Sequence, residues 1–186
     1  ALSVSAHKIG GPVGVGALVL SRETQAEPLL HGGSQQRARS GTQNVAGAVA
    51  FAAALEAAGA AAPGAVAAAP RLARLTELRD RLIAGVRASV PDAVLRGRAP
   101  GADRLPGNAH FTFPGCQGDS LVFLLDAAGV SASVGSACQA GVAEISHVLL
   151  AMGVPEEEAI GSLRFTLGPE TTEAAIDALR RCACRS

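Results

Sequence analysis

The chain has 186 residues, which is enough for one compact domain or for one domain and part of another. A hydrophobic fraction of 48% against a charged fraction of 17% excludes the composition of a disordered protein. Sixteen basic and sixteen acidic side chains cancel, and Trp and Tyr are absent, so the composition argues against a nucleic-acid or anionic-membrane partner and favours a small substrate.

Two short strands are predicted near the amino terminus, over residues 2–6 and 13–21, because glycine-rich sequence separates two apolar runs. The intervening segment HKIGGPVG matches neither a phosphate-binding loop nor a dinucleotide fingerprint, since its Lys precedes its glycines. Lys8 is nevertheless unusual, because it is the only Lys beside fifteen Arg. An Arg cannot lose its proton to form an imine, so Lys8 is either a reactive amine for an aldehyde or, as is common for one Lys, a surface charge.

A polar, glycine-containing loop is expected over residues 27–41, followed by a helix over 45–58 that Asn44 caps. The alanine-rich stretch 60–69 contains Pro and Gly and is interpreted as a connection between domains. Glycine, proline and glutamate interrupt the apolar tract 45–69, and no basic segment precedes an apolar one at the amino terminus. We therefore expect neither a membrane span nor a signal peptide.

A second helix is predicted after Pro70, because leucine and valine recur every three or four residues from Leu72 to Val86. We expect this stripe to face a core and the arginines between its members, Arg79 among them, to face solvent. Beyond the helix, strands are predicted over 93–95, 109–113, 130–134 and 162–167, and helices over 119–128, 145–152 and from 171 onward. Such alternation is typical of an α/β or α+β protein with helices packed on a sheet.

Four cysteines are too few for a disulfide scaffold and lack zinc-binding spacing, so a reducing, cytoplasmic setting is expected. Cys138 lies among small residues in the segment GSACQAG, which predicts an accessible loop on which its thiol acts as a nucleophile. His147, which also suits a helix start, and His110 are then candidate partners in a Cys-dependent hydrolase. No role is assigned to the other cysteines, Cys116, Cys182 and Cys184.

Arg164 stands inside an apolar strand, SLRFTLG. Such an Arg is commonly an outward-facing residue at a sheet edge, but its planar guanidinium also suits bidentate binding of a substrate carboxylate. Arg37, Arg39 and Thr42 could bind phosphate or carboxylate groups in the same way, although this signal is weak by itself.

Six segments of the chain, read in order, are SAHKIGGPVGVGAL, HGGSQQRARSGTQNVAG, NAHFTF, GVSASVGSAC followed by QAG, SHVLLAMG and SLRFTLG. Together they resemble the cysteine desulfurases, the pyridoxal-phosphate enzymes of the class V aminotransferase group. The resemblance implies an α/β fold, namely the carboxy-terminal part of a pyridoxal-phosphate-dependent transferase of the aspartate-aminotransferase type. Residues 1–60 would be a remnant of the large cofactor-binding domain, and residues 61–186 the small α/β domain with the active-Cys loop.

The resemblance also implies a cofactor site. Lys8 would hold pyridoxal phosphate covalently and act as acid and base at the substrate α-carbon. Ser5 and His7 would contact the cofactor phosphate, and Thr42 would reach the phosphate of the neighbouring subunit, because the family is dimeric with shared sites.

For the substrate, the resemblance implies that Arg164 binds the carboxylate of L-cysteine. Cys138 would attack the substrate sulfur and pass it on as a persulfide to an iron-sulfur scaffold or another acceptor protein. Cys138 would also be a ligand of a 2Fe–2S cluster shared with that scaffold.

Two departures from the family pattern bear on activity. Ser34 and Gln36 replace a glycine and a glutamate of the family loop HGGGQE, and the half of the family that precedes the lysine strand is absent from this chain. We therefore expect the isolated chain to bind pyridoxal phosphate poorly and to show little desulfurase activity. The alternatives are a selenocysteine lyase or another class V member and, without catalysis, a domain that docks a scaffold.

Overall fold

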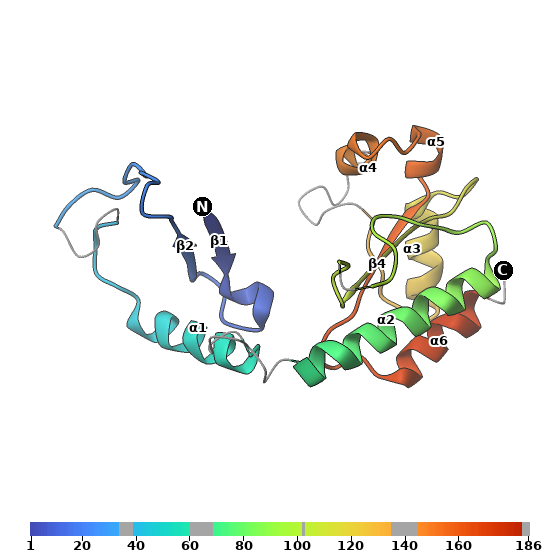
Figure 1. The fold of residues 1–186 in the computed structure, drawn as a ribbon, viewed down its shortest axis with the longest axis horizontal. Helices are drawn as coiled ribbons and strands as arrows, with labels where there is room; N and C mark the ends of the chain where they lie inside the picture. The colour runs from blue at the N-terminus through green and yellow to red at the C-terminus, as the bar shows by residue number, and fades with distance from the viewer. Residues whose placement is uncertain (34–38, 60–68, 102, 135–144, 184–186) are drawn as a thin grey trace. The chain divides into compact units, whose positions relative to one another are not determined.

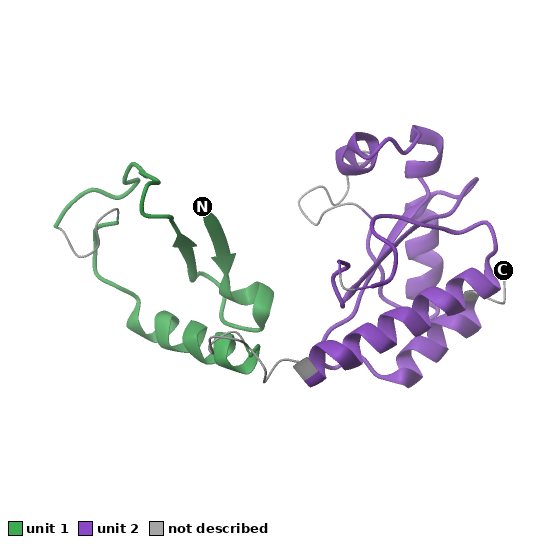
Figure 2. Ribbon diagram, in the orientation of Figure 1, with its two compact units in different colours: residues 1–69 green, residues 70–186 purple. Residues whose placement is uncertain are grey.

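The computed structural model describes residues 1–33, 39–59, 69–101, 103–134 and 145–183. The chain forms two compact units, Ala1–Ala69 and Pro70–Ser186, which are coloured separately in Figure 2 and are described one at a time. The boundary predicted after residue 60 falls at the start of a segment, 60–68, that lies outside the described residues. In the parts of the chain that the structure describes, no helix has the length and apolar character needed to cross a membrane.

Unit 1 contains a β-hairpin and one helix (Figure 1). Strand β1 (Leu2–Ser5) pairs antiparallel with β2 (Gly16–Val19), and a 3-10 turn, η1 (Ala6–Ile9), follows β1 directly. The predicted hairpin is confirmed, although β2 is shorter than the run 13–21, since the chain turns through a positive φ of 79° at Gly14 before pairing begins.

The helix of unit 1, α1 (Val45–Ala57), confirms the predicted helix and its cap. The side-chain oxygen of Asn44 accepts a hydrogen bond of 2.9 Å from the backbone N–H of Gly47, which satisfies one of the free donors at the helix start. Only Phe51 is buried along this alanine-rich helix.

Unit 2 is built on a three-stranded antiparallel sheet in the order β3–β4–β5. Its elements, in chain order, are α2 (Ala69–Ser89), β3 (Val94–Leu95), β4 (Asn108–Thr112), α3 (Gly118–Ala127), α4 (His147–Ala151), α5 (Glu156–Ala159), β5 (Ser162–Thr166) and α6 (Glu173–Ala183). The predicted alternation of strands and helices is confirmed, and α5 is an additional short helix that the sequence analysis missed.

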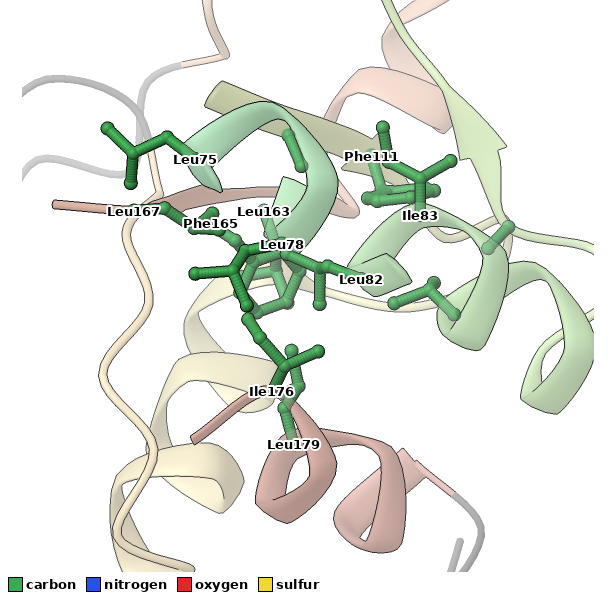
Figure 3. Packing of buried hydrophobic residues seen from close by; sticks show 13 residues of the cluster. Leu75, Leu78, Leu82, Ile83, Phe111, Leu163, Phe165, Leu167, Ile176 and Leu179 are labelled. Carbon is green, nitrogen blue, oxygen red and sulfur yellow. The ribbon is translucent and has the colours of Figure 1, made fainter. Parts of the chain in front are cut away.

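The core of unit 2 lies between one face of the sheet and the helices α2 and α6 (Figure 3). Side chains alternate along a strand, so Ala109 and Phe111 of β4 and Leu163 and Phe165 of β5 point into this core. The apolar stripe of α2 meets them as predicted, except that its first member, Leu72, remains 46% exposed. The intervening positions of β4 and β5 form the opposite, polar face of the sheet.

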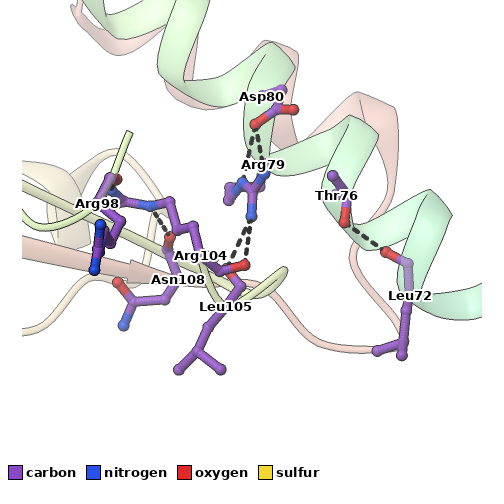
Figure 4. A network of polar contacts seen from close by, with 8 residues as sticks. All are labelled: Leu72, Thr76, Arg79, Asp80, Arg98, Arg104, Leu105 and Asn108. Atoms are coloured by element: carbon purple, nitrogen blue, oxygen red, sulfur yellow. Dashed lines mark hydrogen bonds and ion pairs between the residues drawn. The ribbon is translucent and has the colours of Figure 1, made fainter. Parts of the chain in front are cut away.

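The prediction that Arg79 faces solvent is wrong, because its side chain is fully buried. Figure 4 shows the reason: Nη1 donates to the carbonyl oxygens of Arg104 and Leu105, each at 3.1 Å, and Nε donates to Oδ1 of Asp80 at 2.9 Å. These hydrogen bonds attach the loop at Arg104 and Leu105 to α2. The helical periodicity of α2 does not reveal this contact, because its partners lie about 25 residues away in sequence.

The strand predicted over 130–134 is also wrong. Gly129 adopts a positive φ of 76° at the end of α3, and the N–H of Val130 bonds back to the carbonyl of Leu125 at 2.8 Å. The chain therefore meets the sheet at a single isolated bridge, between Ser133 and Arg164.

Candidate functional site

Lys8 is presented by a turn that the backbone holds tightly. Ala6 is fully buried at the start of η1, and its N–H donates to the carbonyl of Val15 at 3.0 Å. Gly10 closes the turn with a φ of 86°, and the N–H of Gly11 returns to the carbonyl of Ala6 at 2.8 Å. The turn is thereby fixed on a buried alanine while the Lys8 side chain stays exposed.

The side chains around this turn suit a phosphorylated aldehyde. Ser5 is half-buried, whereas His7 and Lys8 are exposed in the same turn. Among the described residues, nothing forms a hydrogen bond or ion pair with the Lys8 amine, so the amine is available for a covalent bond. A hydroxyl, an imidazole and a primary amine within four consecutive residues fit the chemistry of pyridoxal phosphate. Thr42 is exposed in the loop that precedes α1.

The polar face of the sheet in unit 2 brings together His110 and Arg164. They are directly opposed across β4 and β5 and both are half-buried. Directly opposed residues of antiparallel strands are close enough for their side chains to interact. The structure thus places an imidazole beside the guanidinium that the sequence analysis singled out.

Two further arginines lie near His110, and the guanidinium groups of both already have hydrogen-bond partners within the chain. Arg96 donates from Nε to the hydroxyl of Thr112 at 2.8 Å and forms an ion pair with Glu158. Arg104 donates to three backbone carbonyl oxygens, those of Arg96, Arg98 and Asn108.

Arg164 differs from both of these neighbours. Its Nε is buried and has no hydrogen-bond partner, and no described residue forms an ion pair with its guanidinium. A buried donor without an acceptor costs free energy, which an incoming carboxylate would recover. Arg164 is therefore the arginine on this face whose guanidinium has an unsatisfied donor.

The surroundings of His110 disfavour its protonation. Burial disfavours the charged imidazole and lowers the pKa of His110 below its usual value of 6.5, and the positive charges of Arg164, Arg104 and Arg96 lower it further. A neutral imidazole adds no competing charge beside Arg164. The same cationic surroundings make His110 a poor general base for a hydrolase, because such a base must accept a proton.

The backbone of Arg164 ties the start of the Cys138 loop to the sheet. The N–H of Arg164 donates to the carbonyl of Ser133 at 2.8 Å, and the N–H of Ser133 donates back at 3.1 Å. Cys138 itself lies outside the described residues, but it follows Ser133 by five positions.

The other predicted residues receive less support from their surroundings. His147 is exposed as the first residue of α4, and the hydroxyl of Ser146 caps that helix. Cys116 and Cys182 are half-buried and line an apolar cavity of about 850 Å³. Within the described residues no group of histidine, cysteine and carboxylate side chains could hold a metal ion.

The sequence analysis did not foresee the pair Arg96 and Glu158, or the contact of Ser133 with Arg164. Arg96 and Glu158 are 62 positions apart, so no local pattern connects them. The strand predicted over residues 130–134 implied that Ser133 could pair with a neighbouring strand, but it did not identify Arg164 as the partner.

A family model described as aminotransferase class-V matches residues 1–179, which is nearly the whole chain. The chain belongs to the class-V aminotransferase family. It is 54% identical to the "IscS-like cysteine desulfurase" of Mycobacterium tuberculosis over 96% of this chain and 44% of that protein. The expected family is confirmed.

Two solved structures of NifS-like proteins support the fold. A protein titled "NIFS-LIKE PROTEIN" superposes with a TM-score of 0.77 at 33% identity, over 97% of this chain and 44% of the other. The NifS-like protein of Rickettsia africae superposes with a TM-score of 0.79 at 28% identity, over 97% of this chain and 45% of the other. The fold is therefore part of a pyridoxal-phosphate-dependent α/β transferase, and the chain spans less than half the length of the relatives it matches.

Proposed function

We propose that this chain is the carboxy-terminal half of a cysteine desulfurase, which removes sulfur from L-cysteine, releases L-alanine and passes the sulfur on through Cys138. The observation that carries the proposal is Arg164, the half-buried arginine with an unpaired Nε on the polar face. Its guanidinium has an unsatisfied donor for the substrate carboxylate, while its backbone is bonded to Ser133, which precedes Cys138 by five positions. One residue thus connects the binding of the amino acid with the placement of the thiol.

In this proposal Lys8 carries pyridoxal phosphate, which the family membership implies, and moves protons at the α-carbon of the substrate. Ser5 and His7 bind the phosphate from the same turn, and Thr42 does so for a partner subunit. When bound, the cofactor supplies an electron sink for negative charge at the substrate carbon. Its site at Lys8 belongs to unit 1 and Arg164 belongs to unit 2.

Cys138 takes the sulfur as a thiolate. Its sulfur attacks the sulfur of the substrate, so that an S–S bond forms while the C–S bond breaks, and the carbon keeps the electron pair and ends as the methyl group of alanine after taking up a proton. The resulting persulfide is handed to an acceptor protein, for which an iron-sulfur scaffold is one candidate. A 2Fe–2S cluster shared with a scaffold at Cys138 belongs to the same proposal.

The test uses a chimera, since residues 1–186 alone are expected to bind the cofactor weakly. The part of the M. tuberculosis relative that precedes the matched region is joined to residues 1–186, and alanine formation from L-cysteine is measured. Arg164→Ala should raise KM about ten- to a hundredfold, the effect of losing a hydrogen bond to a charged group, with a smaller change in kcat. Arg181→Ala, which replaces an exposed arginine of the same unit, should behave as the unsubstituted chimera.

Two further readouts separate the alternatives. Borohydride trapping followed by mass spectrometry should place the cofactor adduct on Lys8, and an adduct on any other residue would contradict the proposal. Cys138→Ser should keep the cofactor absorption band and lose alanine formation, which a Cys-dependent hydrolase does not predict. L-selenocysteine, offered beside L-cysteine, shows whether the protein is a lyase for the selenium analogue instead.

A further inference from the structure

His110 has an arginine as its direct neighbour on each side of strand β4. Arg164 of β5 is its cross-strand partner. On the other side, the backbone N–H of Arg96 donates to the carbonyl of His110 at 2.8 Å, so the register that pairs Leu95 with Phe111 continues to Arg96. Residues directly opposed on antiparallel strands point to the same face of a sheet and lie within reach of one another. Arg96, His110 and Arg164 therefore form a row across the polar face of unit 2.

The two arginines of this row differ in how their charge is compensated. Arg96 forms an ion pair with Glu158 of α5 and also donates to the hydroxyl of Thr112. Arg164 forms no ion pair within the described residues, and its buried Nε has no hydrogen-bond partner. An anion that enters this face therefore finds the uncompensated positive charge at Arg164, next to His110.

The other charged groups near His110 do not offset this positive charge. Arg104, in the segment between β3 and β4, donates to three backbone carbonyls and pairs with no carboxylate among the described residues. His110 also lines a hollow of about 260 Å³, to which helix α4 contributes apolar side chains and not its titratable residue, His147. The exposed residues Arg98 and Asp103 line the same hollow, and their opposite charges sum to zero.

These surroundings oppose a proton on the imidazole. The pKa of His110 is lowered by burial first and then by the charges of Arg164, Arg104 and Arg96. All three of these charges are positive, so the cost of charging His110 depends on whether they are compensated. An opposite charge within about 4–6 Å of an ionisable group changes its proton affinity about tenfold or more. A carboxylate on the guanidinium of Arg164 brings such a charge to the row.

We propose that a carboxylate bound at Arg164 makes His110 take up a proton, so that His110 couples the affinity of this site for an amino acid to pH. The proton comes from the solvent, and the one new bond is an N–H bond on the imidazole. This inference rests on the proposed function, because it takes the carboxylate of the amino acid as the anion. His110 is thereby assigned to the carboxylate site and not to a Cys-dependent hydrolase.

The direction of the pH effect follows from linkage between the two binding events. The free chain protonates His110 only below its ordinary pKa of 6.5, whereas the chain with a bound carboxylate does so at a higher pH than the free chain. In the pH window between these two values, each bound carboxylate brings one proton with it, so the affinity rises as the pH falls. Above the window the imidazole is neutral in both states, and below it the imidazole is charged in both, so His110 adds no pH dependence on either side.

The first test follows the imidazole directly in residues 1–186, without cofactor or turnover. The ring Cε1–H signals of the four histidines are titrated against pH by NMR in sodium propionate and, at equal ionic strength, in sodium chloride. The signal of His110 is identified by its absence in His110→Gln. It should titrate about one pH unit higher in propionate than in chloride, while the remaining signals titrate alike in both salts. Identical midpoints for His110 in the two salts would overturn the proposal.

A variant at position 164 separates this coupling from a general effect of the salt. In Arg164→Ala the loss of one positive charge should raise the midpoint of His110 in chloride, and propionate should no longer change it. Arg164→Gln, which loses the charge but keeps a polar side chain, carries the same expectation if circular dichroism shows that the alanine variant is unfolded. Arg181→Ala removes an exposed arginine that does not act on His110, so it should keep the response of the unsubstituted chain. Equal behaviour at positions 164 and 181 would contradict the role of Arg164.

The second test uses the cofactor-loaded chimera and L-cysteine. At each pH the KM of His110→Gln is divided by that of the unsubstituted chimera, which removes the titrations that both proteins share, such as those of the substrate and the cofactor. This ratio should rise up to about tenfold as the pH falls through the window, with a smaller change in kcat. The same ratio for His147→Gln, which replaces an exposed histidine of the same unit, should stay constant. A constant ratio for His110→Gln would show that the substrate binds without the proton.

The two proposals fail in different ways. If the chain is not part of a desulfurase, the chimera forms no alanine, while the titration of His110 in propionate still reports an anion at Arg164. If the coupling is absent, alanine forms, but the midpoint of His110 ignores propionate or the KM ratio ignores pH.

Discussion

The arginines of unit 2 show that the surroundings of a guanidinium decide its role. Arg79 is buried and bound to carbonyl and carboxylate oxygens, and Arg104 is bound to backbone carbonyls alone. Arg96 is neutralised by Glu158. Arg164 has a buried Nε without a hydrogen-bond partner and, unlike Arg79, whose other nitrogens bind carbonyl and carboxylate oxygens, its guanidinium has no side-chain or carbonyl partner among the described residues.

His110 should make the stability of unit 2 depend on pH. Its pKa is lowered in the folded protein by burial and by three nearby arginines, so the unfolded chain binds a proton at a higher pH than the folded chain does. As the pH falls below about 6.5, protonation of the unfolded state therefore removes stability until the folded-state pKa is reached. His110→Gln should flatten this part of the profile in urea denaturation measured at several pH values.

The control for that measurement is His147→Gln, which replaces an exposed histidine of the same unit and should keep the pH dependence of the unsubstituted chain. If the two variants have parallel profiles, the neutral state of His110 is not the source of the slope.

At the scale of elements, α2 does more than cover the sheet. Its buried Arg79 holds the carbonyls of Arg104 and Leu105, and Arg104 in turn binds two carbonyls between β3 and β4 and one at the first residue of β4. These hydrogen bonds fix a segment without regular structure, which lines a hollow of about 260 Å³ together with Val148 and Leu149 of α4. Helix α2 therefore positions the residues that line this hollow, although no residue of α2 lines it.

Arg79→Ala should lower the free energy of unfolding by at least about 2 kcal/mol, since each buried acceptor left unpaired costs about 1–3 kcal/mol. Hydrogen exchange should also become faster in residues 96–105, which lose their anchor. Arg81→Ala is the matched comparison on the same helix, because Arg81 pairs with Glu173 and Asp177 at the surface. A loss of stability at Arg81 as large as that at Arg79 would contradict this account.

At the scale of the whole chain, burial is unequal between the two units. Every member of the main core cluster belongs to unit 2, from Leu75 to Leu179, whereas Ala6 and Phe51 are the buried hydrophobic residues among those described in unit 1. A two-stranded hairpin with one helix and so small a core is marginal by itself.

Residues 69–186, which retain all of α2, should therefore unfold cooperatively with the same thermal midpoint as the full chain. Residues 1–59 should show no cooperative transition in calorimetry. Absence of a transition in the longer piece would show that unit 2 depends on unit 1, contrary to the distribution of buried side chains.

The sequence predicted the strands and helices that have regular periodicity, and it predicted the family from ordered motifs. The sequence-based prediction failed at two places, where a long-range contact of one side chain or a turn at one glycine determines the local structure. Arg79 follows the helical pattern of a surface position, and only the distant carbonyls of residues 104 and 105 explain its burial. The alternating segment VSASV, residues 130–134, looks like a strand, but after the turn at Gly129 its pairing with the sheet is the isolated bridge at Ser133.

In the candidate functional site, too, the sequence indicated individual residues but not their surroundings. Lys8 could be singled out because it is the only lysine, and Arg164 because it interrupts an apolar strand. The lowered pKa of His110 arises from burial and then from Arg164, Arg104 and Arg96, and strand pairing between segments far apart in sequence produces these surroundings. No local pattern contains that information.

The bridge between Ser133 and Arg164 uses main-chain atoms only, so it does not depend on which side chains follow it. A substitution at position 133 should therefore leave the bridge intact unless it introduces proline, which has no backbone N–H to donate.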